Sequence, residues 1–211
     1  TGGTGSTTAP TPSTATAGST SYWVASTNAN GCESERVEIV VNVNAYATHL
    51  NFDGINDFVL SANAVTNNTQ NQTYQAWFRI PSIPVNSDVI LQRGNDGSGG
   101  WSVQMGVNAT GRLSAGISAS PDTYLTGTTV LTPNTWYHAT FVFENNNSLR
   151  LYLDGNLEAS VAIGNRTLRN SDNRLRVGSG NIASEFFNGD IDEVRVWDVA
   201  LSATDILATK D

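Results

Sequence analysis

Two groups of oxygen-bearing side chains could together hold a hard cation such as calcium. Asp53, Asn56 and Asp57 lie in one short segment, and Asp190 and Asp192 alternate near the C-terminal end. Calcium takes about six to eight oxygen ligands from carboxylates, amides and backbone carbonyls. Neither group supplies that number alone, so a calcium site requires a fold that brings the two segments together.

The histidines and the cysteine give no signal for catalysis or zinc binding. His49 and His138 are the only histidines in the sequence, and neither lies near a Gly-x-Ser-x-Gly motif or another nucleophile motif. Cys32 is the single cysteine, so no ligand spacing typical of zinc is present. No EF-hand loop occurs either.

A second set of side chains suits sugar binding. Sugar rings stack an apolar face on an aromatic ring and form hydrogen bonds at their rims. Trp101 follows a glycine-rich segment, but a tryptophan that begins a strand is often part of the core, so both roles stay open. The candidate ligand-binding residues are Arg93, Asp96, Trp101, Tyr124 and Asn146.

The composition excludes several classes of partner. The net charge is −8, and Lys210 is the only lysine among 11 basic residues. An acidic, lysine-poor surface does not suit nucleic acid or anionic lipid. No apolar run approaches the length needed to span a bilayer. A polar surface made of Asn, Thr, Ser and Gly is common in extracellular β proteins.

The N-terminal part of the chain predicts a linker followed by a hairpin. Residues 1–21 are almost entirely Gly, Ser, Thr, Ala and Pro, which is typical of a linker or of disorder. Tyr22-Trp23-Val24 and the alternating run Val37–Val43 flank a polar turn and predict two paired strands. An isolated hairpin is marginal in water, so this one needs a host.

From Thr48 onward, short strands separated by turn signals predict a β-sandwich with one short helix after Ser202. Side chains alternate across a strand, so residues two apart share a face. The predicted core residues are Tyr74, Ala76, Phe78, Ile80, Tyr137, Ala139, Phe141, Phe143, Leu149, Leu151 and Leu153. The predicted strands are Thr48–Phe52, Asp57–Leu60, Gln72–Ile80, Asp88–Gln92, Trp101–Val107, Arg112–Ile117, Trp136–Phe143, Leu149–Leu153, Leu157–Ile163, Arg174–Val177 and Asp190–Trp197.

Residues 1–44 resemble the C-terminal half of an immunoglobulin-like repeat of large Bacteroidetes surface proteins. The markers are Tyr22-Trp23-Val24 and Asn30-Gly31-Cys32-Glu33-Ser34. In such repeats the first half precedes this segment and carries another cysteine. The resemblance therefore leaves two alternatives for Cys32, a disulfide partner further upstream or a buried free thiol.

Residues 48–211 resemble the laminin-G-like, concanavalin A-like jelly-roll superfamily. The motifs lie along the whole segment, and the opening and closing ones are together the most specific. We therefore expect an all-β fold, an antiparallel two-sheet jelly-roll sandwich (48–211) preceded by a partial immunoglobulin-like β segment (1–44). The motifs are Leu50-Asn51-Phe52-Asp53-Gly54, Ala76-Trp77-Phe78, Trp136-Tyr137-His138-Ala139, Leu151-Tyr152-Leu153-Asp154-Gly155, Arg176-Val177-Gly178 and Ile191-Asp192-Glu193-Val194-Arg195-Val196-Trp197.

The resemblance implies a structural calcium ion between the opening loop and the closing strand. Its expected ligands are Asp53, Gly54, Asn56, Asp190 and Asp192. The alternative is that Asp53 caps its turn and Asp192 pairs with Arg195. Laminarinase-like enzymes of this fold carry an alternating Glu-x-Asp-x-Glu strand, but here the third position is Val194.

The sequence thus favours a non-catalytic, extracellular binding or adhesion module of a larger secreted or cell-surface protein. Its expected partner is a glycan or a cell-surface ligand, with calcium as a structural cofactor. The alternative is a structural or assembly subunit, in which the 22–43 hairpin self-associates or accepts a complementing strand. An enzyme, such as a glycoside hydrolase or lyase, is the least favoured class.

Overall fold

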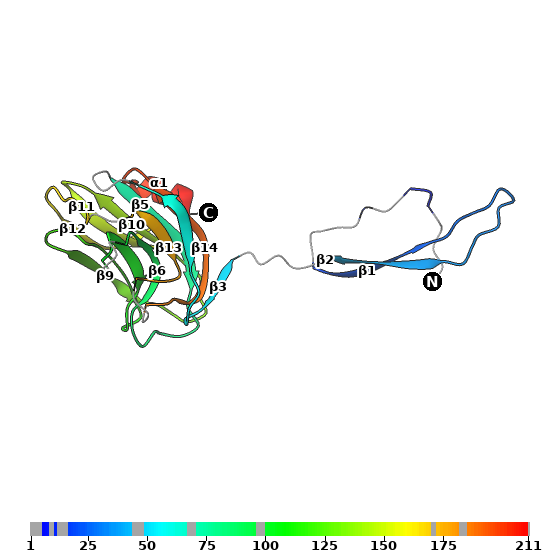
Figure 1. Cartoon of the computed structure of the whole chain (residues 1–211), viewed down its shortest axis with the longest axis horizontal. Helices are drawn as coiled ribbons and strands as arrows, with labels where there is room; N and C mark the ends of the chain where they lie inside the picture. Colours follow the sequence, from blue (N-terminus) through cyan, green and yellow to red (C-terminus); the bar gives the residue numbers. More distant parts are fainter. Residues whose placement is uncertain are drawn as a thin grey trace. The chain divides into compact units, whose positions relative to one another are not determined.

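The computed structural model describes residues 6–8, 11, 17–43, 49–66, 71–95, 100–169, 172–181 and 185–210. The chain divides into two compact units, Thr1–Thr48 and His49–Asp211 (Figure 1). Among the described residues, no helix is both long enough and apolar enough to cross a membrane.

The first unit contains a two-stranded antiparallel sheet of β1 (Gly18–Val24) and β2 (Val37–Val43). The strand begins at Gly18, so the prediction of a linker through residue 21 is wrong for its last residues. Ser19–Ser21 pair with Val40–Asn42, and the Ser19 hydroxyl donates to Asn42 Oδ1 at 2.6 Å. The strand pairing thus provides hydrogen-bond partners for backbone groups that a linker would leave to solvent. Cys32 is an exposed free cysteine, which contradicts the buried-thiol alternative.

The second unit is a sandwich of two antiparallel six-stranded sheets, as the sequence predicted. The first sheet has the order β12-β11-β10-β5-β14-β3, and the second has the order β4-β13-β6-β7-β8-β9. The strands are β3 (Leu50–Asp53), β4 (Val59–Ala64), β5 (Gln72–Arg79), β6 (Asp88–Arg93), β7 (Val103–Val107), β8 (Arg112–Ile117), β9 (Thr123–Val130), β10 (Tyr137–Glu144), β11 (Ser148–Leu153), β12 (Asn156–Ala162), β13 (Arg174–Val177) and β14 (Asn188–Trp197).

The core lies between the two sheets and is built mainly from alternate residues of the strands; β6, with a register shift between Val89 and Leu91, contributes the consecutive residues Ile90 and Leu91. On β5, Tyr74, Ala76 and Phe78 face inward and are fully buried. The other predicted core residues are buried as well, except Tyr137, which is partly buried and packs against the same cluster. The period-two pattern therefore predicted the inner face correctly.

The strand β9 was missed by the sequence analysis, yet it closes one edge of the sandwich. It pairs with β8, and its Thr128 and Thr129 meet Glu158 of β12, which belongs to the other sheet. The Glu158 carboxylate accepts four hydrogen bonds, from the backbone amides and the hydroxyls of both threonines, at 2.6–2.9 Å. Burial would raise the pKa of Glu158, but these hydrogen bonds outweigh it and lower the pKa.

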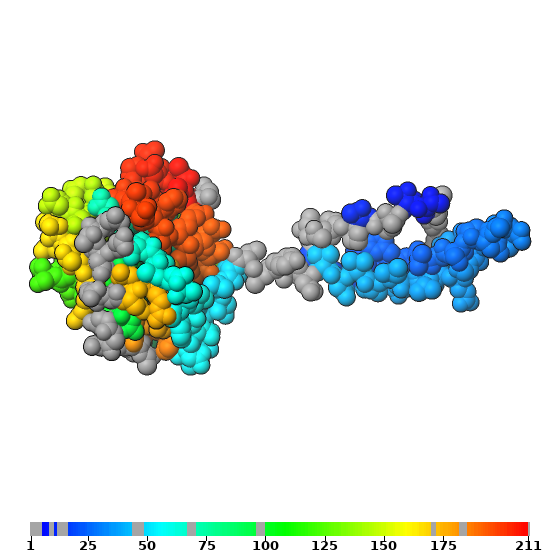
Figure 2. Space-filling model, turned by 45° about the horizontal axis from the view of Figure 1, so that its top comes forward, coloured from blue at the N-terminus to red at the C-terminus, as the bar shows by residue number. Residues whose placement is uncertain are grey.

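A short C-terminal helix, α1 (Ala203–Thr209), covers part of the outer face of the first sheet. Ser202 caps it as predicted, in a capping box with Asp205. Ile206 and Leu201 pack on Val142 and Tyr152, whose side chains point away from the main core. Figure 2 shows this C-terminal segment, in red, on the surface of the sandwich. In the described part of the chain, α1 is the only helix, and it lies on the first sheet.

Candidate functional site

The opening loop after β3 holds Asp53 in a turn. Its Oδ1 accepts hydrogen bonds from the amides of Ile55 and Asn56, at 2.8 and 3.4 Å. The amide of Asp53 in turn donates to Asp57 Oδ2 at 3.3 Å. This is the turn-capping role that the sequence analysis gave as the alternative to calcium binding. Asn56 contributes its amide to the same turn.

Asp190 of the closing strand is held by cations and an amide. Its Oδ2 lies 2.6 and 2.8 Å from two nitrogens of Arg79, and its Oδ1 accepts from Asn51 at 2.8 Å and lies 3.3 Å from His49 Nε2. Burial alone would raise the pKa of Asp190, but these hydrogen bonds and the charges of Arg79 and His49 lower it. Asp190 is therefore paired with Arg79 in this structure, and its role as a calcium ligand stays a prediction.

Asp192 does not pair with Arg195, which was the predicted alternative to calcium binding. Its Oδ1 accepts from the adjacent Glu193 amide at 2.8 Å, and Arg195 pairs with Glu193 rather than with Asp192. Asp53 lies opposite Asn188 in the β3–β14 ladder, so Asp190 is two residues further along. Asp53 and Asp190 are therefore offset by two residues along the paired strands, and calcium binding by the five predicted ligands stays a prediction. In the described part of the chain, no cluster of three or more His, Cys, Asp and Glu residues suits a metal ion.

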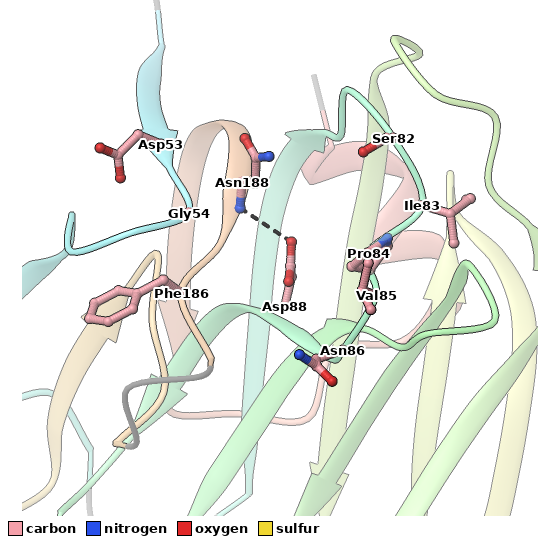
Figure 3. A pocket seen from close by; sticks show the side chains of 10 residues that line it. All are labelled: Asp53, Gly54, Ser82, Ile83, Pro84, Val85, Asn86, Asp88, Phe186 and Asn188. Atoms are coloured by element: carbon pink, nitrogen blue, oxygen red, sulfur yellow. Dashed lines mark hydrogen bonds between the residues drawn. The ribbon is translucent and has the colours of Figure 1, made fainter.

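Two of the predicted calcium ligands lie close to two oxygen-bearing residues that were not predicted as ligands. Asp53 and Gly54 line a recess together with Asp88 at the start of β6 and Asn188 at the start of β14 (Figure 3). Asp88 Oδ2 accepts from the Asn188 amide at 3.3 Å, while the Asp53 carboxylate points away from Asp88. Burial raises the pKa of Asp88 more than this hydrogen bond lowers it. Ser82 and Asn86 add further oxygens to the lining.

Of the predicted ligand-binding residues, the structure brings Trp101 and Tyr124 together. Their rings are in edge contact, with centroids 5.5 Å apart and planes at 65°. Tyr124 is 59 % exposed, and Trp101 is partly exposed, which rules out a fully buried core role. A row of register partners leads to Tyr124 across the second sheet, formed by Arg176, Gln92, Gln104, Gly116 and Tyr124.

This row lies on the outer face of the sheet. Val103 and Met105 point into the core, so Gln104 between them points outward. Gln104 Nε2 donates to Gln92 Oε1 at 3.1 Å and to Glu185 Oε2 at 3.5 Å. A Cβ on Gly116 would lie 2.8 Å from Tyr124 Cδ1, so the tyrosine ring leans across the space that glycine leaves open. We call Trp101, Gln104, Gly116, Tyr124 and Glu185 the Tyr124 face.

The remaining predicted ligand residues lie elsewhere. Arg93 is fully buried on the inner side of β6, donating to the Thr66 carbonyl at 3.2 Å, so it is not a surface contact for a ligand. Burial lowers the pKa of Arg93, and the charges of Tyr74 and Asp172 oppose that effect. Asn146 lies in the turn between β10 and β11, which belong to the first sheet. Asp96 lies outside the described residues.

Sequence reasoning missed Gln104 and Glu185. The alternation of β7 gave a usable signal for Gln104, because it separates two apolar residues. Glu185 lies in an irregular segment before β14, where no periodicity predicts the direction of a side chain.

A family model described as the concanavalin A-like lectin/glucanases superfamily matches residues 52–207. The chain belongs to this superfamily. The match covers most of the second unit, from the Phe52-Asp53-Gly54 motif to α1.

Several solved structures are similar to this chain in fold. A heptameric pentraxin from Limulus polyphemus is 16 % identical, with a TM-score of 0.60 over 76 % of this chain and 80 % of that one. The CBM40 domain of a Ruminococcus gnavus sialidase, bound to α2,3-sialyllactose, is 13 % identical, with a TM-score of 0.58 over 68 % and 84 %. A candidate carbohydrate-binding protein from Bacteroides ovatus is 18 % identical, with a TM-score of 0.60 over 83 % and 50 %. No curated protein matches the sequence significantly.

These neighbours are mostly described as binding domains, although identities this low establish only the fold. The description of the superfamily includes both lectins and glucanases. The arrangement of carboxylates is relevant here, because a glucanase needs catalytic carboxylates and a lectin does not. Asp190 and Asp192 share the outer face of β14, but Asp190 is engaged by Arg79. A retaining glycosidase needs one carboxylate as nucleophile and another as acid. The described carboxylates of β14 do not offer that pair.

Proposed function

We propose that this protein is a non-catalytic glycan-binding module of a secreted or cell-surface protein, and that it binds through the Tyr124 face. The observation that carries the proposal is the exposed Tyr124 ring, which leans over Gly116 with Trp101 at its edge. An exposed aromatic ring beside small residues offers a flat surface on which a sugar ring can stack.

The polar groups around the ring support this proposal. Gln104 presents an amide, and Ser114 and Thr126 pair on the neighbouring row of the same face. Amides and hydroxyls can both donate to and accept from sugar hydroxyls, which suits an uncharged ligand rim. The structural neighbours described as binding sialyllactose or as candidate carbohydrate-binding proteins share the fold that presents this face.

Replacing Tyr124 by Ala should weaken glycan binding about 10-fold or more, because it removes the stacking surface while leaving a solvent-exposed position. Binding is measured on a glycan array, and the best ligand is then titrated by calorimetry. Tyr124→Phe should retain most of the affinity.

Trp23→Ala is the matched control, since Trp23 is equally exposed but lies in the first unit. Unchanged binding by Tyr124→Ala would contradict the assignment of this face. An array on which the wild-type protein binds no glycan would contradict the proposed function itself.

We also propose a calcium ion, at the recess of Asp53, Gly54, Asp88 and Asn188 rather than at the originally predicted ligand set. Asp88 supports this position, because burial raises the pKa of its carboxyl and a cation would compensate the buried charge. Asp53 would contribute only after its carboxylate turns toward the recess, whereas the Gly54 carbonyl belongs to the same loop.

Calcium should raise the melting temperature of the wild-type protein relative to EGTA, and Asp88→Asn should abolish that rise. In EGTA, Asp88→Asn should melt at or above the wild-type temperature, because a carboxyl with a raised folded-state pKa destabilises the fold at neutral pH. Asp192→Asn should keep the calcium response. If the wild-type protein has the same melting temperature in calcium and in EGTA, the proposed calcium site is wrong.

A second candidate function, assembly, rests on the hairpin of the first unit. Tyr22, Val24, Val37 and Ile39 share one face of the two-stranded sheet, and the last three are half-exposed or more. Exposed apolar faces and open strand edges mark association sites. We propose a second copy of the chain as the occupant of this face.

Sedimentation of the wild-type chain should reveal a concentration-dependent dimer, and Ile39→Lys should shift it to monomer. Glu38→Lys, on the opposite face of β2, is the control. A wild-type monomer at high concentration would rule out this second function.

A further inference from the structure

The Tyr124 face carries negative charge close to the aromatic ring. Glu185 Oε2 lies 3.5 Å from Gln104 Nε2, and Gln104 is the register partner of Gly116, over which the Tyr124 ring leans. Asp122 lies two residues before Tyr124 and caps the β8–β9 connection by accepting from Ser118 and Ala119. Burial first, and then the charges of Asp122 and Glu185, raise the pKa of Tyr124.

The cations of the same outer face lie further away. Arg176 is four strands from Tyr124 in the row, about 19 Å at the usual strand spacing. Its guanidinium lies over the Phe58 ring at 4.3 Å and contacts the Ser179 hydroxyl. Arg112 is four residues from Gly116 along β8, about 13 Å away.

Arg166 and Arg169 are the basic residues to weigh against Asp122. Arg166 donates to the carbonyl of Ser120, in the β8–β9 connection, at 3.3 Å, and Arg169 lines a recess there together with Asp122, so the charge of Asp122 is opposed. Glu185 lies instead on the Gln104 side of the Tyr124 ring, away from that recess. The negative charge that a ligand would meet on the face is therefore carried mainly by Glu185.

We infer that the Tyr124 face selects uncharged glycans and disfavours glycans that carry a carboxylate or a sulfate beside the stacked sugar. This inference rests on the proposed glycan-binding function. A ligand carboxylate next to Glu185 would meet like charge in a partly desolvated site, which opposes binding. The preference differs from that of the CBM40 domain, which is described as bound to sialyllactose although it shares the fold.

The test is an array of neutral oligosaccharides printed beside their sialylated and sulfated counterparts, at neutral pH and low salt. Each charged glycan should bind about 3- to 10-fold more weakly than its neutral parent. Added salt should reduce this difference in affinity, because it screens the repulsion between like charges. Glu185→Gln should also reduce the ratio between the affinities for the neutral parent and for its charged counterpart at low salt, because it removes the like charge that the ligand carboxylate or sulfate meets.

Glu193→Gln is the matched control, because it removes the same charge from the net −8 on an exposed part of the other sheet. It should leave the difference in affinity between neutral and charged glycans unchanged. An equal effect of the two variants would instead attribute the preference to the net charge of the protein and overturn the inference. Charged glycans that bind as well as their parents, with Tyr124→Ala still abolishing binding, would overturn the inference alone. An array without any bound glycan would overturn the proposed function and this inference together.

Discussion

Replacing Asp190 by Asn should lower the free energy of unfolding by about 2–3 kcal/mol. The substitution keeps the shape of the side chain but removes the charge that Arg79, Asn51 and His49 contact at 2.6–3.3 Å. Arg79 would then lose the negative charge opposite it, while its stacking over Trp136, at 5.2 Å, would remain. For a domain of this size, the loss corresponds to a fall in melting temperature of about 5–10 °C.

Asp192→Asn is the matched control, because Asp192 lies on the same strand and accepts only a local hydrogen bond from Glu193. It should change stability by less than about 1 kcal/mol. Both variants are measured by urea unfolding, with the slope checked for constancy. Equal and small losses in the two variants would show that the Asp190 ion pair adds little.

The contribution of Asp190 should also depend on pH in a defined direction. Its folded-state pKa is lowered below the ordinary value of 3.8, so the stabilisation is present above that value and is lost as the pH falls through the folded-state pKa. The difference in melting temperature between the wild-type protein and Asp190→Asn should therefore be constant near neutral pH and shrink below about pH 3.8. A difference that persists at lower pH would assign the effect to packing instead of charge.

The fold was predictable wherever large apolar residues alternate. The inward faces of β10 and β11 each carry three such residues, and that of β5 carries Tyr74 and Phe78 on either side of Ala76. Their burial matches the period-two pattern. The strand β9 lacks this pattern, because Leu125 is its only large buried residue and Thr and Gly fill most other positions. It pairs with the preceding strand β8, and its outer edge is stabilised by Glu158, which is distant in sequence and gives no local signal.

The candidate site was only partly predictable, because residue type does not determine the direction of a side chain. Trp101 and Tyr124 were found by type, and the fold brings their rings into contact. Arg93 was chosen for its charge, since arginine is rarely fully buried, but the alternation along β6 turns it inward. Asp190 was predicted as a calcium ligand, yet Arg79 on the neighbouring strand β5 forms an ion pair with it. Only the pairing of β14 with β5 reveals that neighbour.

Replacing Gly178 by Ala should be more damaging, lowering the free energy of unfolding by about 3 kcal/mol or more. Gly178 has a φ of +82°, which favours glycine, and an added Cβ would overlap the ring of Phe52. The amide and carbonyl of Gly178 are both used, by Ile90 and Phe187 at 2.9 Å, so the backbone is tied in this position. The opening motif and the Arg176-Val177-Gly178 motif therefore depend on each other.

Gly164→Ala is the control for Gly178→Ala, because nothing lies within 4 Å of a Cβ at that position. It should change the free energy of unfolding by no more than about 0.5 kcal/mol. A double variant with Phe52→Ala and Gly178→Ala distinguishes the two causes of the loss, which are overlap with the Phe52 ring and the backbone conformation of Gly178. Overlap with the ring predicts that the double variant loses less stability than the two single losses added together, since removing the ring makes room for the new methyl group. Additive losses would mean that the backbone conformation alone requires glycine, and the contact between the two motifs would then have no part in the requirement.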